Sequence, residues 1–172
     1  MLEDVVGPAT RSIVYSFMLG VPDAAGKGLS YCDEEFTTCM KNNADAPLWQ
    51  RALFYTPFAG VVARFMFDGM VKSAEHVDEQ RAKLANAFTR IEPMLGSPPL
   101  VAKGATDDGQ PTAAAIALAA LVMPVVAAEI SLSSSSAARE RRSAETARWR
   151  ATAVGQFSLA VYAEHSRTPK LV

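Results

Sequence analysis

The sequence predicts an all-α fold, a helical bundle formed by one domain of residues 1–172. Three observations predict it. Apolar residues recur three, four and seven positions apart in several segments, which is the period of amphipathic helices. Glycine and proline separate these segments, and no segment alternates apolar and polar residues as a strand does. One uncharged apolar run, at 113–128, is too long for a strand and predicts a buried helix.

The first predicted helix covers 5–19. Pro8 is tolerated only in a first helical turn, so the helix begins near Gly7, and Gly20 ends it. Its apolar face consists of Val6, Ile13, Val14, Phe17 and Met18. Residues 20–47 are rich in turn-forming residues and predict a loop, with a short helix at 34–40.

A second helical region is predicted at 48–71, and Pro57 divides it. Its apolar stripe consists of Phe58, Val61, Val62, Phe65, Met66 and Met70. A longer amphipathic helix begins after Ser73 and ends before Gly96 and two prolines. Its apolar residues recur at helical spacing and are Val77, Leu84, Phe88, Ile91 and Leu95.

The run at 112–128 is predicted to contain the buried central helix of the bundle. Thr112 stands at its start as N-cap, because a threonine oxygen can accept from backbone N–H groups of the first turn. Residues 113–128 carry no charge, so this helix belongs in the centre of a bundle or in a membrane. Its 16 residues span about 24 Å, less than the roughly 30 Å of bilayer hydrocarbon. That length favours the bundle, with a membrane helix as the alternative.

The last predicted helix covers 137–164 and is basic at its start and apolar towards its end. Gly155 predicts a kink or a boundary within it. The arginines between 139 and 150 alternate with Glu140 and Glu145, which is the pattern of a solvated helix face supported by neighbouring charge pairs.

Composition and charge exclude several classes of function. A net charge of −1 provides no basic surface for nucleic acid. Glu3 and Asp4 stand where a secretory signal carries basic residues, which predicts an intracellular, cytoplasmic protein. Cys32 and Cys39 would lie about 10 Å apart on a helix, too far for a disulfide, and no histidine lies nearby at zinc-ligand spacing. Two reduced structural thiols are therefore predicted.

The candidate catalytic and metal-binding groups all have a structural interpretation. His76 fits a first helical turn, and His165 lies near the end of the chain. The carboxylates at 33–35 and 107–108 are typical of solvated loops, and the serines at 133–136 lack the context of a nucleophile. The sequence therefore predicts no catalytic residue, no metal site and no cofactor.

Several segments match one protein family in the family's own order. They are 101–104 with the acidic loop that follows, the capped helix start at 111–116, Pro124, the pair Ile91-Glu92 with Leu95, and Trp149 and Gly155 before the closing segment 157–165. Together they resemble the C-terminal helical domain of the cytosolic glutathione S-transferase superfamily, over about residues 2–169. The resemblance implies that Arg11, Tyr15 and Met18 border an apolar cleft for a hydrophobic ligand. Core or surface packing of these three residues is the alternative.

Two departures separate the chain from that family. The family has an aspartate three residues after the helix cap, where this chain has Ala115, and losing the reciprocal hydrogen bond costs about 1 kcal/mol. The family binds glutathione chiefly through an N-terminal thioredoxin-like domain, which the residues before Val5 do not encode. Glutathione is therefore expected as a ligand only if that domain is supplied.

The chain is thus expected to be a non-catalytic binding or assembly module. In relatives, the missing domain covers faces of the first and central helices, and such an uncovered face would favour a protein partner or self-association. The alternative is a fragment of a glutathione transferase, which conjugates glutathione to hydrophobic electrophiles, with the catalytic domain lying upstream.

Overall fold

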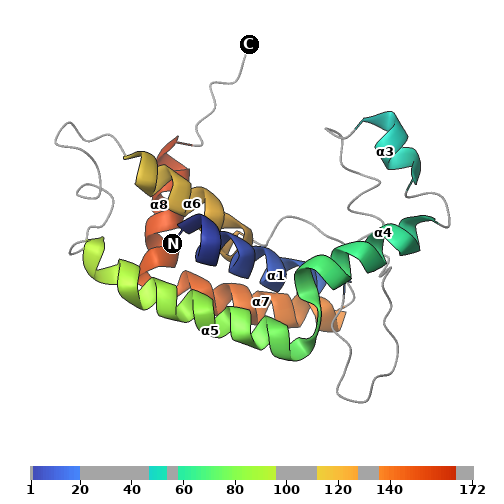
Figure 1. Cartoon of the computed structure of the whole chain (residues 1–172). Coiled ribbons are helices and arrows are strands. Elements are labelled where there is room, and N and C mark those ends of the chain that lie inside the picture. The colour runs from blue at the N-terminus through green and yellow to red at the C-terminus, as the bar shows by residue number, and fades with distance from the viewer. Residues whose placement is uncertain (1, 20–46, 54–57, 96–111, 128–135, 166–172) are drawn as a thin grey trace, which may run out of the picture.

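All of the regular secondary structure in the described part of the chain is helical. A computed structural model describes residues 2–19, 47–53, 58–95, 112–127 and 136–165. Helices α1 (Gly7–Leu19), α5 (Ala74–Ile91), α6 (Ala113–Val126), α7 (Ser136–Arg150) and α8 (Ala153–His165) pack into a bundle, and α3 (Leu48–Leu53) and α4 (Phe58–Met66) extend to one side of it (Figure 1). The predicted all-α bundle is confirmed for these residues.

Helix α1 lies in the middle of the bundle, in contact with α5 and α6 (Figure 1). A π-helical turn, η1 (Leu2–Val6), precedes it, and α1 begins at Gly7 with Pro8 in its first turn, as predicted. The buried hydroxyl of Thr10 donates to the carbonyls of Val6 and Gly7, each at 3.0 Å. This hydroxyl therefore needs no partner from another helix.

A tight corner joins α4 to α5. Helix α4 continues into a π-helical turn, η2 (Phe67–Val71), after which Lys72 adopts φ 62° and ψ −62°. The Ser73 N–H donates to the Val71 carbonyl at 2.7 Å and closes a γ-turn around Lys72, a strained conformation for a residue with a side chain. Ser73 Oγ accepts from the His76 N–H at 3.1 Å and caps α5. This corner sets the direction in which α4 leaves the bundle.

Helix α5 buries the face that the sequence predicts. A 3₁₀ turn, η3 (Glu92–Met94), extends it by three residues. The predicted apolar residues are all buried, namely Val77, Leu84, Phe88, Ile91 and Leu95. The charged side chains of Asp78, Glu79 and Lys83 are exposed, so the amphipathic pattern is confirmed.

Helix α6 has the predicted cap but is buried on one side only. The Ala115 N–H donates to Thr112 Oγ1 at 3.1 Å, which confirms Thr112 as N-cap. The covered face packs against α1, α7 and α8 and buries Ala115, Leu118, Ala119, Val122, Val125 and Val126. The other face is exposed and consists of Ala113, Ala114, Ile116, Ala117, Ala120 and Pro124. The prediction of burial all round is wrong because most of this face is alanine, which places little apolar area in water.

The predicted boundary near Gly155 separates α7 from α8. The Thr152 hydroxyl donates to the Trp149 carbonyl at 2.7 Å and accepts from the Gly155 N–H at 3.0 Å, so Thr152 is the N-cap of α8. Just before it, Arg150 Nε donates to the Val126 carbonyl at 2.5 Å. This contact places a positive charge at the C-terminal end of α6, where the helix dipole favours it.

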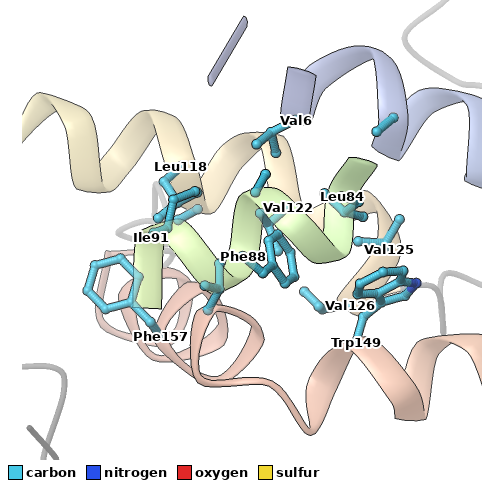
Figure 2. Close-up of a cluster of buried hydrophobic side chains, with 14 of the residues drawn as sticks. Val6, Leu84, Phe88, Ile91, Leu118, Val122, Val125, Val126, Trp149 and Phe157 are labelled. Atoms are coloured by element: carbon cyan, nitrogen blue, oxygen red, sulfur yellow. The ribbon is translucent and has the colours of Figure 1, made fainter. Parts of the chain in front are cut away.

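The core lies where these bundle helices meet. Figure 2 shows its buried side chains, with Phe88 and Trp149 in edge-to-face contact at a ring-centroid distance of 5.4 Å. Among the described helices, none is both long and apolar enough to cross a bilayer. The predicted short helix at 34–40, with Cys32 and Cys39, lies outside the described residues.

Candidate functional site

The residues expected to border a ligand cleft lie on α1. Arg11 is exposed and Tyr15 is half-buried one turn later, whereas the side chain of Met18 lies outside the described part of the chain. A pocket does form among the described residues, but it lies between α5 and the α7–α8 boundary. A ligand-binding role for these three residues stays a prediction.

The other candidate groups lie apart from one another or outside the described ranges. His76 lies in the first turn of α5, with its Nε2 at 3.3 Å from Nε2 of Gln80. Burial, followed by the positive charge of Lys72, lowers the pKa of His76. Within the described ranges, no three histidine, cysteine or carboxylate side chains gather as a metal site would require. The groups at 33–35, 107–108 and 133–135 and the His165 side chain lie outside those ranges.

A polar cluster that the sequence does not predict joins α5 to α7. Glu145 Oε1 accepts from Trp149 Nε1 at 2.8 Å and from Arg81 Nε at 3.1 Å, and only 14% of the Glu145 side chain is exposed. Arg142, one turn earlier on α7, is also buried. The prediction that the charged residues of this helix are solvated is therefore wrong for Arg142 and Glu145. The sequence shows the i, i+4 spacing of Glu145 and Trp149, but Arg81 is 64 residues from Glu145.

Exposed large apolar side chains gather on α4. Phe65 is 80% exposed and Val61 is 65% exposed. With Arg64 of α4 and Asp68 of the η2 turn that continues it, they occupy positions i, i+3, i+4 and i+7, which lie on one side of the segment, and all four are exposed. Arg64 Nε and Asp68 Oδ2 form an ion pair at 2.8 Å. We call these four residues the α4 surface.

The opposite side of this segment packs against the bundle. Ala63, Phe67 and Val71 are buried, and η2 contacts α1. The predicted apolar stripe is therefore not one buried face, because Val61 and Phe65 lie in solvent. Apolar periodicity cannot show which of two apolar faces another element covers, so the sequence does not reveal the α4 surface.

Helix α3, like the α4 surface, exposes large apolar side chains. Leu48 and Trp49 are largely exposed, and α3 lies beyond the end of the bundle (Figure 1). By contrast, none of the described large apolar side chains of α1 is exposed, and α6 exposes Ile116 alone among its large ones. Of the seven large apolar side chains that are exposed among the described residues, four lie on α3 and α4, whereas the exposed face of α6 consists mainly of alanine.

Comparisons with models of protein families, with curated proteins and with solved structures find no match to this chain. The likeness to the glutathione S-transferase C-terminal domain therefore rests on sequence features, among them the Thr112 cap and Gly155 in the first turn of α8. Both features are present in the structure. Each one meets a local backbone requirement that other helical bundles share, so neither identifies a family.

Proposed function

We propose that this chain is a non-catalytic assembly module of the transferase C-terminal type, and that two copies associate through the α4 surface. The observation that carries the proposal is the make-up of that surface. One exposed side of α4 and the adjoining η2 turn presents Val61 and Phe65 together with a cation, Arg64, and an anion, Asp68.

The apolar pair supplies the driving force. Removing apolar surface from water is worth about 25 cal/mol per Å². Phe65 and Val61 are one turn apart, so their exposed areas are adjacent and a single contact removes both from water. Because the other side of the segment is already covered through Ala63 and Phe67, association needs no rearrangement of the bundle.

The charges favour a second copy of the chain over an unrelated partner. When two α4 helices pack antiparallel about a two-fold axis, Arg64 of each copy lies opposite Asp68 of the other. The same arrangement brings the two Phe65 side chains together near the axis. The surface is thus complementary to itself in both charge and apolar character, which is what an isologous interface requires.

The first test is the oligomeric state of the full chain, measured by sedimentation velocity over a range of protein concentrations. The unmodified chain is expected to form dimers as concentration rises, and Phe65→Ser is expected to stay monomeric. Met94→Ser is the matched control, because Met94 is 78% exposed but lies away from the α4 surface. A monomer at every concentration, or equal effects of the two substitutions, contradicts the proposal.

Charge reversal tests the pairing itself. Arg64→Asp alone and Asp68→Arg alone each place like charges opposite one another and are expected to weaken self-association. An equimolar mixture of the two variants is expected to associate, since each cation then faces an anion of the other chain. A change confined to the helix within one chain could not produce this recovery. Retention of the unmodified chain on immobilised glutathione would contradict the non-catalytic proposal and support the transferase alternative.

A further inference from the structure

A pocket of about 220 Å³ opens between α5 and the α7–α8 boundary. Its apolar wall includes Ala85 and Phe88 of α5, Trp149 of α7 and Val154 of α8. The pocket volume lies below the roughly 300–1,000 Å³ of sites for drug-sized ligands, so its size suits a small metabolite.

The aromatic part of this wall is held in place by the structure behind it. Phe88 and Trp149 meet edge to face with an interplanar angle of 80°, and both labelled rings lie within the core in Figure 2. Glu145 accepts the indole N–H of Trp149 and is itself bonded to Arg81. A ligand therefore meets a wall that is already ordered, which lowers the entropy cost of binding.

Two side chains of opposite charge line the same pocket from different helices. Arg148 lies on α7 with its guanidinium carbon 5.1 Å from the centroid of the Trp149 ring, and Glu92 lies in η3 at the end of α5. Neither forms an ion pair with the other or with another described residue. The pocket thus presents a cation and a carboxylate that the described protein does not neutralise.

We propose that this pocket binds a small zwitterion with an apolar side group, a ligand of the α-amino acid class. The ligand carboxylate pairs with Arg148, its ammonium group pairs with Glu92, and its side chain lies in the mouth of the pocket against Ala85 and the edge of Phe88. A simple anion would be repelled by Glu92, and a simple amine would be repelled by Arg148. A molecule that carries both charges is the one that satisfies both groups.

The binding test uses L-leucine with two analogues that each lack one charge. These are 4-methylpentanoate, which lacks the amino group, and 3-methylbutylamine, which lacks the carboxylate. In a Trp49→Phe background, Trp149 is the single tryptophan of the chain and its fluorescence reports the pocket. Saturable binding of leucine is expected, with each analogue about tenfold weaker because one charged pair is missing. The absence of saturable binding, or equal binding of all three compounds, overturns the proposal.

Charge-neutral variants assign the two ends of the ligand. Arg148→Gln is expected to remove the preference for leucine over 3-methylbutylamine, the analogue without a carboxylate. Glu92→Gln is expected to remove the preference for leucine over 4-methylpentanoate, the analogue without an amino group. Arg90→Gln is the matched control, because Arg90 is exposed on α5 but does not line the pocket. Variants that keep the preferences of the unmodified chain contradict the assignment. Because the pocket and the α4 surface share no residue, Phe65→Ser is expected to bind leucine as before, so the two proposals fail independently.

Discussion

The carbonyl oxygen of Trp149 occupies the space in which a side chain on Gly155 would begin. A Cβ atom on Gly155 would overlap that oxygen, and it would also lie 3.0 Å from the Trp149 carbonyl carbon and 3.1 Å from Oγ1 of Thr152. The end of α7 and the first turn of α8 therefore approach too closely for any residue with a Cβ. Glycine is needed at this position for space rather than for an unusual dihedral angle.

Replacing Gly155 by alanine is expected to destabilise the protein by about 2 kcal/mol, because the atom in the way is backbone and the α7–α8 boundary must open. Gly60→Ala is the matched control. A Cβ on Gly60, inside α4, has no neighbour within 4 Å, so the substitution is expected to stabilise by about 0.5–1 kcal/mol. Urea unfolding followed by circular dichroism measures both. Equal changes in the free energy of unfolding would refute the close-approach argument.

Removing the Glu145 carboxylate is expected to destabilise the bundle by about 2 kcal/mol in Glu145→Ala, since the buried Trp149 indole N–H loses its acceptor. Glu145→Gln keeps an acceptor oxygen, so its loss is expected to be smaller. Asp78 also pairs with Arg81, at 2.6 Å, but its side chain is 71% exposed. Asp78→Asn is therefore expected to change the free energy of unfolding by less than about 1 kcal/mol. Equal losses of stability in Asp78→Asn and Glu145→Ala would contradict this prediction.

Two buried serines are expected to respond differently to alanine. Ser12 is 2% exposed, and its hydroxyl has no hydrogen-bond partner among the described residues. The Ser158 hydroxyl is fully buried but donates to the Val154 carbonyl at 2.8 Å. Ser12→Ala removes an unsatisfied polar group and should raise the free energy of unfolding relative to Ser158→Ala by about 1 kcal/mol. Chemical denaturation of both variants decides this; a lower stability for Ser12→Ala would contradict it.

Acidification is expected to destabilise the protein through His76. Burial and then the charges of Lys72 and Lys83 lower its pKa in the folded state, while Glu79 opposes them. The unfolded state therefore binds a proton first as the pH falls below the ordinary pKa of 6.5. The stability contribution of neutral His76 is complete above that pH and is lost as the pH falls through the folded-state pKa. His76→Gln is expected to remove this component. NMR titration of the imidazole resonance measures the pKa directly, and a folded-state value above 6.5 would contradict the prediction.

Local chemistry made much of the fold predictable. The Thr112 cap, the first-turn position of Pro8 and the boundary near Gly155 all depend on residues within a few positions of one another, and all three are confirmed. The apolar face of α5 is confirmed for a related reason. Only one face of that helix is apolar, so this is the only face that can be buried favourably against the other helices.

By itself, the sequence determined where α1 and α5 begin, the Thr112 cap of α6 and the break near Gly155. For α4 and α6, the tertiary structure alone decided which apolar residues are covered. It left Phe65 on α4 and one side of α6 exposed, and it brought Arg81 to Glu145 across the bundle. The physical reason is that a cap or a break is a contact within one segment of chain, whereas burial is a contact between elements that are distant in sequence. The α4 surface and the pocket beside Trp149 both depend on contacts between elements that are distant in sequence.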